Sequence, residues 1–128
     1  MKIKSLKTKT REKDDAWARR VKDRDGWKCI VCGKTDRLNA HHIIPREVQG
    51  YKYDLANGVS LCVKHHKFDR DISAHCAPFA FLIWLKRCRP EQYELAHSRL
   101  NDMLFSNDKF LRFYDPNKIV VEDEYEVV

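Results

Sequence analysis

Four of the six histidines of this chain form two adjacent pairs, His41–His42 in "NAHHIIPRE" and His65–His66 in "LCVKHHKFD". Histidine is the side chain that combines metal ligation with proton transfer near neutral pH. Neighbouring residues point in different directions, so the two members of a pair cannot easily serve one centre. Each pair therefore predicts two separate chemical roles.

Cysteines accompany the second pair at a spacing typical of metal ligands. Two residues separate Cys29 from Cys32, and two residues separate Cys62 from His65. Such a spacer brings both donors of a pair to one ion, and Zn²⁺ takes four N or S donors in a tetrahedron. We predict a structural zinc site with these four ligands. Two alternatives stay open: His66 could replace His65, or the cysteines could simply be small core residues.

The remaining histidines indicate a second centre. If His65 closes the zinc site, His66 is rotated by about 100° on a helix and faces another space, toward the strand that carries His41 and His42. A divalent ion held by two or three protein groups keeps positions for water and for a phosphate oxygen. A neighbouring neutral histidine suits the base that activates water. This combination is what phosphodiester hydrolysis requires.

The segments "LNAHHIIPR" and "DLANGVSLCVKHH" resemble the HNH nucleases over about Trp27 to Phe68. The resemblance implies a ββα-metal fold, a hairpin and a helix around one catalytic ion. It implies that His41 and His66 bind that ion and that His42 is the general base. It also implies that Asn57 braces the loop between the strands and so orients the base.

Two positions depart from the family pattern. The last zinc ligand is His65 instead of the commoner cysteine, and Arg70 stands where some members have a further metal ligand. Asp69, Asp71 and His75 are the nearby alternatives for a third group on the catalytic ion. Histidine ligation permits Mg²⁺, Mn²⁺, Ni²⁺ or a similar cation by donor type.

Arg46 follows the first histidine pair closely in the chain. A guanidinium can hold a phosphate through two hydrogen bonds, so Arg46 is a possible phosphate-binding residue. An ordinary surface arginine would look the same in the sequence.

The elements that position these residues follow from the apolar pattern. A helix is expected in "DDAWARRVKDRDG", with Asp14 or Asp15 as its cap and Gly26 at its end. Residues 38–44 and 59–62 are expected to be strands, with Asn57-Gly58 as a turn signal between them. A helix should follow from Cys62 to Asp71.

Two further helices are expected from apolar residues at helical spacing in "APFAFLIWLKRC" and "RPEQYELAHSRLNDML". The predicted fold class is α+β, a ββα-metal HNH core with a zinc knuckle, an N-terminal helix and a C-terminal helical hairpin. The predicted divisions are a flexible basic arm (1–12), the nuclease core (13–72), a helical extension packed on the core (73–114) and an acidic tail (115–128).

The charge distribution favours an anionic partner. The formal net charge is +6, and residues 1–22 hold nine Lys/Arg against three Asp/Glu. Cationic side chains on such an arm neutralise phosphates and release counterions, although a solvated terminus would have the same composition. No apolar run approaches the roughly 20 residues of a membrane span, and no apolar region of a signal peptide follows the first lysines. We expect a cytosolic protein with reduced cysteines.

The sequence therefore predicts a metal-dependent DNA endonuclease of the HNH type, acting on duplex or branched DNA. Residues 72–104 loosely resemble the C-terminal helices of HNH proteins from phages and prophages, which implies a similar origin. Two other functions remain open, a non-catalytic zinc module that binds nucleic acid and a phage assembly or packaging factor. The oligomeric state and the DNA specificity are not encoded in these residues.

Overall fold

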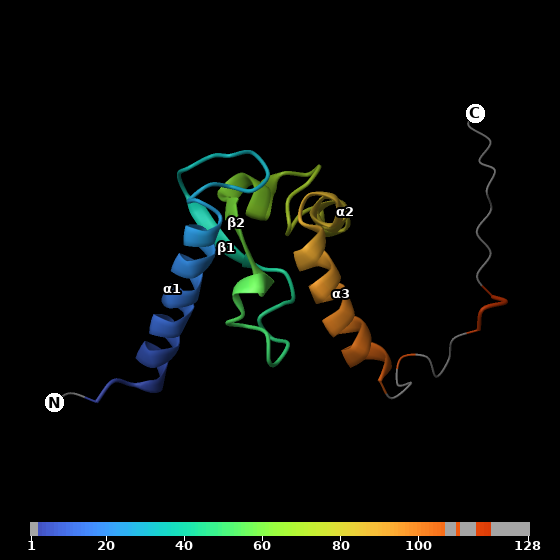
Figure 1. Cartoon of the computed structure of the whole chain (residues 1–128), viewed down its shortest axis with the longest axis horizontal. Coiled ribbons are helices and arrows are strands. Elements are labelled where there is room, and N and C mark those ends of the chain that lie inside the picture. Colours follow the sequence, from blue (N-terminus) through green and yellow to red (C-terminus); the bar gives the residue numbers. More distant parts are fainter. Residues whose placement is uncertain (1–2, 107–109, 111–114, 119–128) are drawn as a thin grey trace.

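The computed structural model describes residues 3–106, 110 and 115–118, so most of the predicted acidic tail lies outside the described residues. Its elements, in chain order, are α1 (Leu6–Arg24), β1 (Leu38–His42), a 3-10 turn η1 (Leu55–Asn57), β2 (Gly58–Cys62), a π-helical turn η2 (Lys64–Phe68), α2 (Pro78–Cys88) and α3 (Pro90–Phe105) (Figure 1). The mixed helical and two-stranded architecture confirms the predicted α+β class.

The first helix begins earlier than the sequence analysis expected. Ser5 is its N-cap, and the Ser5 hydroxyl accepts a hydrogen bond from the Thr8 N–H at 3.2 Å. Lys and Arg are good helix formers, so a capped lysine-rich segment can continue a helix without burying any residue. Helix α1 therefore begins at Leu6 and not at the cap expected at Asp14 or Asp15. Trp17 and Val21, which lie four residues apart and so share a face of the helix, are the buried residues of α1.

The two strands form an antiparallel hairpin in which Leu38 pairs with Cys62 and His42 pairs with Gly58. β1 ends at His42, two residues before the predicted end. Every residue of β2 is buried, whereas every residue of β1 is only half-buried. Among the described residues the sheet has only these two strands, so the outer edge of β1 is unpaired.

Gly58 is not a turn residue, contrary to the prediction from the Asn57-Gly58 pair. It is the first residue of β2, with an extended backbone at φ −122° and ψ 147°. A Cβ atom placed there would lie 2.6 Å from Cζ2 of Trp17 and would also clash with Cγ2 of Val21. The glycine is needed because α1 lies directly against the strand.

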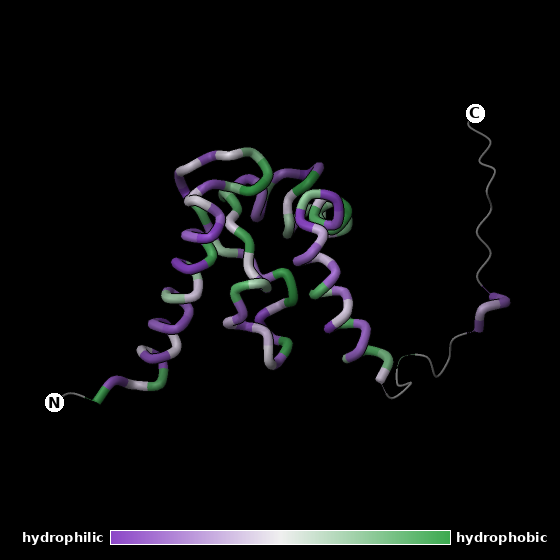
Figure 2. The backbone as a smooth tube through the Cα atoms, viewed as in Figure 1, coloured by the Kyte–Doolittle hydropathy of each residue, from purple (hydrophilic) through white to green (hydrophobic). Residues whose placement is uncertain are grey.

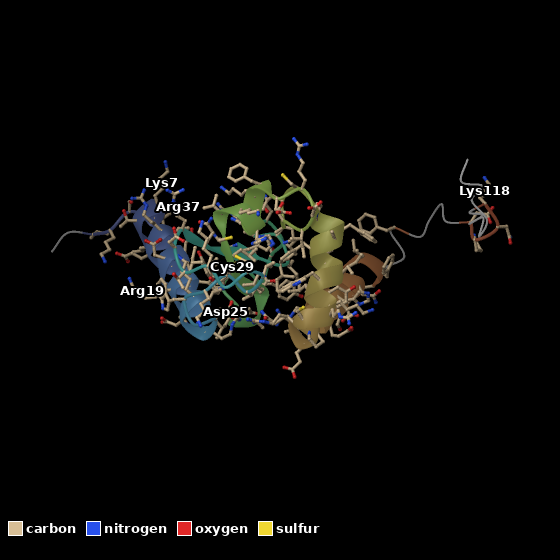
Figure 3. The ribbon with its side chains drawn as sticks, turned by 90° about the horizontal axis from the view of Figure 1, so that it is seen from above. Lys7, Arg19, Asp25, Cys29, Arg37 and Lys118 are labelled. Atoms are coloured by element: carbon tan, nitrogen blue, oxygen red, sulfur yellow. The ribbon has the colours of Figure 1, made fainter. Side chains whose placement is uncertain are left out.

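A buried carboxylate joins the end of α1 to β2 and to the start of α3. Asp25 accepts hydrogen bonds from the Ser60 N–H at 2.8 Å, from Arg24 at 2.9 Å and from Arg89 at 3.0 Å (Figure 3). Burial alone would raise the pKa of the Asp25 carboxyl, but these donors lower the pKa below its ordinary value. The network thus fixes three elements that are far apart in the sequence.

The two predicted C-terminal helices are present, but they do not form the predicted hairpin, because only Arg89 lies between them. α2 is seen end-on in Figure 1 while α3 runs in the plane, so the two helices meet at a corner. Phe81 and Leu85 of α2 enter the core, which they share with Cys29, Val59, Leu61, Cys62 and Ala74. Cys88, the last residue of α2, is exposed.

The helices differ in their apolar content, and α1 is predominantly hydrophilic along its length (Figure 2). None of the helices in the described part of the chain combines the length and apolar composition that a membrane span requires.

Replacing Gly58 with Ala should lower the free energy of unfolding by about 1–3 kcal/mol, because the new methyl group overpacks the contact with Trp17. Urea unfolding would measure this effect. Ser60→Ala is the control on the same strand, since the buried Ser60 hydroxyl has no hydrogen-bond partner among the described residues. Equal stability of the Gly58→Ala variant and the wild type would contradict the close packing of α1 on β2.

Candidate metal centres and catalytic groove

The four predicted zinc ligands converge at the centre of the molecule, where Figure 3 labels Cys29. Their donor atoms all lie within 4.8 Å of one another. The sulfurs of Cys32 and Cys62 are 3.8 Å apart, and Nδ1 of His65 lies 3.3 Å from the Cys62 sulfur and 3.7 Å from the Cys29 sulfur. With Zn–S bonds of about 2.3 Å, two sulfurs of a tetrahedral site lie about 3.8 Å apart. The cluster fits a zinc knuckle.

Backbone hydrogen bonds hold the knuckle in shape. The Gly33 N–H donates to the Cys29 carbonyl at 2.8 Å, in a turn that requires a positive φ of 77° at Gly33. The Ile30 N–H donates to the Ser60 carbonyl at 2.9 Å and so attaches the knuckle to β2. Cys62 closes β2, and η2 follows at once with His65. The ligands thus reach one point from three connected segments.

The electrostatics of the sulfurs fit a cation. Burial alone would raise the pKa of the Cys29 thiol, but backbone N–H groups of Cys62, Cys32 and Val31 lower it. Burial and the neighbouring sulfurs of Cys29 and Cys62 raise the pKa of the Cys32 thiol, because charges of the same sign repel. A divalent cation among the sulfurs would relieve that repulsion.

His66 is not part of the zinc cluster. It forms a second group with His41 and His75, whose candidate donor atoms also lie within 4.8 Å of one another. Nε2 of His66 is 3.0 Å from Nε2 of His75, and the His41 ring centroid is 5.1 Å from that of His66 and 5.5 Å from that of His75. With metal–nitrogen bonds of about 2.1 Å, two ligands at a right angle lie about 3.0 Å apart.

The segment after η2 brings His75 to this group. The π-helical turn closes with a hydrogen bond from the Asp69 N–H to the Lys64 carbonyl at 2.8 Å. The chain then folds back, so that the His75 N–H donates to the His66 carbonyl at 3.0 Å. Of the three alternatives for a third group, only His75 joins the cluster. The Asp69 carboxylate instead accepts hydrogen bonds from the N–H groups of Asp71 and Ile72.

Two members of the second group, His41 and His66, have strongly lowered pKa values. Burial, followed by the nearby His66, His75 and His42, lowers the pKa of His41 to about 3. Burial, His75 and Lys67 lower the pKa of His66 to about 4. Neutral imidazoles offer lone pairs, so both side chains are ready to act as metal ligands at pH 7.

His42 points away from this group, as strand alternation dictates. Its ring stacks on Trp17 of α1 with centroids 3.9 Å apart and planes 10° apart. Nε2 lies 3.0 Å from the Lys52 carbonyl, which can only accept, so Nε2 carries the proton and Nδ1 keeps the lone pair. Burial, with the charges of Arg46 and Lys52, lowers the pKa of His42 from its ordinary value. The imidazole is therefore a fixed, neutral proton acceptor.

Asn57 is buried, with 2% exposure, and braces the loop that supplies the Lys52 carbonyl. Its Oδ1 accepts from the Ile44 N–H at 2.8 Å, and its Nδ2 donates to the carbonyls of Ile44 at 3.0 Å and Tyr51 at 3.2 Å. The side chain thus ties the two ends of the loop together. Because Lys52 follows Tyr51 directly, Asn57 also fixes the acceptor that orients His42.

All four of these histidines line one groove of about 540 Å³, which runs along the open edge of β1. Arg46 also lines the groove; it is exposed, and it makes no hydrogen bond or ion pair among the described residues. A second hollow, of about 640 Å³ between the end of α1 and the start of α3, contains none of the histidines. The chemistry of the molecule is therefore concentrated at the β1 edge.

The sequence analysis missed the part that Trp17 plays at the site. No local pattern in the sequence links Trp17 to His42 across 25 residues. The Nε1–H of Trp17 also donates to the Asp54 carbonyl at 2.8 Å, in the loop that Asn57 braces. Trp17 thus contacts both the His42 ring and the loop that orients it.

The hairpin, the helical turn that follows it and the Cys/His cluster that fits a zinc knuckle define a small α+β domain. Residues 29–67 match the family model described as HNH endonuclease, so this segment is an HNH domain and the resemblance is confirmed there. No significant match to the chain was found among curated proteins or among solved structures.

Replacing Cys29 with Ala should remove stoichiometric zinc and lower the melting temperature sharply, because metal binding and folding are coupled at such sites. Zinc content by mass spectrometry of the native protein, together with thermal unfolding, would test this expectation. Cys88→Ala is the matched control, since Cys88 is exposed and lies outside the cluster. Retention of full zinc by the Cys29→Ala variant would contradict the four-ligand assignment.

Proposed function

We propose that the protein is a metal-dependent DNA endonuclease that hydrolyses phosphodiester bonds. The observation that carries the proposal is the groove itself, in which a cluster of three histidines adjoins a separately oriented histidine base. The match to the HNH endonuclease family supports a nuclease-type function. A binding module would have no need of a base beside a metal ligand.

In this proposal His41, His66 and His75 hold one divalent cation. The bound cation supplies positive charge that polarises a phosphate oxygen and stabilises the leaving 3′ oxygen. Imidazole donors suit Ni²⁺, Zn²⁺ and similar ions better than Mg²⁺, which prefers oxygen. A third histidine narrows the range of cations that the sequence allowed.

His42 takes the proton from the attacking water through Nδ1. Its Nε2–H stays on the Lys52 carbonyl, which holds the ring against rotation and stabilises the imidazolium that forms. Asn57 and Trp17 act as positioning residues, because they fix the loop and the plane of the ring. Arg46 has free donors at the groove and binds a phosphate of the substrate. Cleavage leaves a 5′ phosphate and a 3′ hydroxyl, as the family resemblance implies.

The zinc at the first cluster has a structural role and keeps His65, and with it His66, in place. The phage or prophage origin implied by residues 72–104 stays a prediction.

Replacing His42 with Ala should reduce the nicking of supercoiled plasmid by roughly 10²- to 10⁴-fold, the usual contribution of a general base. The assay uses protein whose catalytic site has been stripped by a mild chelator and reloaded with Ni²⁺, Mn²⁺, Zn²⁺ or Mg²⁺ in turn. His97→Ala is the control, because His97 is exposed on α3. DNA that is bound but never cut by the wild type, under any cation, would favour the non-catalytic zinc module instead.

Replacing His75 with Asn should raise the half-saturating concentration of the activating cation, because a metal ligand is lost. Partners that only contact metal ligands contribute roughly 10- to 100-fold in affinity, so the loss of a ligand should cost at least as much. Nicking rates across a titration of Ni²⁺ or Mn²⁺ provide the measurement. Asp71→Asn is the matched control, since Asp71 is exposed and is outside the cluster. A normal cation requirement in the His75 variant would remove His75 from the ligand set.

A further inference from the structure

The N-terminal half of α1 projects from the domain without packing on it (Figure 1). All residues from Leu6 to Lys13 are exposed, and the buried residues of the helix lie only in its second half. Burial of an apolar face does not account for the helical conformation of this segment, because none of its side chains is buried. Its cationic side chains must therefore be considered as a surface for a partner.

The helical period divides those cations between two faces. Along α1, Lys7, Arg11, Asp14 and Ala18 follow one another at intervals of four, three and four residues. All four therefore lie on one face of the helix. Asp14 and Ala18 line the catalytic groove, as does Lys22 one turn later. The row of Lys7 and Arg11 therefore continues the wall of the groove beyond its end.

Lys9 and Lys13 form the opposite face of this segment. At about 100° per residue, Lys9 is turned by about 170° and Lys13 by about 130° from the centre of the row of Lys7, Arg11, Asp14 and Ala18. Lys13 lies one turn before Trp17, whose buried indole also lines the groove. Figure 3 shows the same helix presenting side chains such as Lys7 and Arg19 on different sides. The chain thus offers two cationic pairs of equal charge on one helix, only one of which continues the row of Asp14 and Ala18.

The charge inside the groove does not account for DNA binding. Its lining contains three cations, Lys22, Arg46 and Lys67, and three carboxylates, Asp14, Asp15 and Glu47. Asp14 is itself occupied by the Tyr53 hydroxyl at 2.8 Å and by Lys52 at 3.3 Å. Phosphate affinity must therefore come in part from outside the groove. Lys7 and Arg11 make no ion pair or hydrogen bond through their side chains among the described residues, so both are available.

We propose that Lys7 and Arg11 form a phosphate-binding arm for the duplex DNA that flanks the bond being cut. The proposal rests on the proposed nuclease function, because it concerns how the same groove holds its substrate. Lys7 lies seven residues before Asp14, the first residue of α1 that lines the groove, so the arm extends about 10 Å beyond the groove at 1.5 Å per residue. This length corresponds to about three base pairs of duplex at 3.4 Å each.

The test compares Lys7→Gln with Arg11→Gln, as one double variant, against Lys9→Gln with Lys13→Gln. Both variants lose two positive charges from exposed positions of the same helix. Binding to a fluorescent duplex of about 24 base pairs is measured by anisotropy over a salt series, without added divalent cation. Each lost phosphate contact lowers the slope of log affinity against log salt by about 0.9.

For the groove-side variant we expect a loss of affinity on the order of 10- to 100-fold near 0.1 M salt and a slope reduced by about 1.8. The opposite-face variant should change both quantities far less. With a duplex shortened to about eight base pairs, the difference between the groove-side variant and the wild type should shrink, because the arm extends past the duplex.

Equal losses in the two variants would overturn the proposal, because net charge alone would then explain them. Duplex binding that neither variant weakens, or no duplex binding by the wild type, would also overturn it. Binding is measured separately from cleavage, so the two proposals fail independently. If the wild type binds DNA through this face but never nicks it, the proposed arm stands and the proposed nuclease function fails. If the wild type nicks DNA but the two variants bind equally well, the nuclease function stands and the arm fails.

Discussion

The close approach of α1 to the hairpin is the constraint on which the rest of the structure depends. The indole of Trp17 occupies the space above Gly58 that any other residue would fill with a side chain. From that position it stacks on His42, the strand partner of Gly58, and donates to the Asp54 carbonyl. A packing contact of the core and the orientation of the proposed base are therefore one and the same interaction. The Asp25 network secures the other end of the helix.

The two histidine pairs separate their members by different means. In β1 the alternation of the strand sends His41 to one side and His42 to the other, and the groove reaches both because it follows the open edge. In η2 the helical rotation sends His65 to the sulfurs and His66 to the second cluster. One short hairpin and one helical turn thus position four imidazoles at three places, although the two members of each pair are adjacent in the chain.

The parts of the site that could be predicted from sequence are those set by local spacing. Two-residue spacers place Cys29, Cys32, Cys62 and His65 without reference to the rest of the fold, and the family resemblance supplied the order of His41, His42, Asn57 and His66. The missed parts depend on contacts that are distant in sequence. The Asn57-Gly58 pair has the composition of a turn, but the glycine is required because Trp17 packs against it. The sequence offered His75 only as one of three alternatives, because it reaches the cluster through a π-helical turn and a reversal of the chain. The early start of α1 needed a cap at Ser5 and no burial at all, so apolar periodicity could not reveal it.

The adjacency of His65 and His66 has a thermodynamic consequence. An ion at either cluster fixes the backbone of the same two residues, so it also reduces the conformational entropy that the neighbouring cluster must lose on binding its own ion. Such coupling is reciprocal: the factor by which the first ion strengthens the second is the factor by which the second strengthens the first. If both clusters hold an ion, the two centres would be separate in their chemistry but coupled in their affinities.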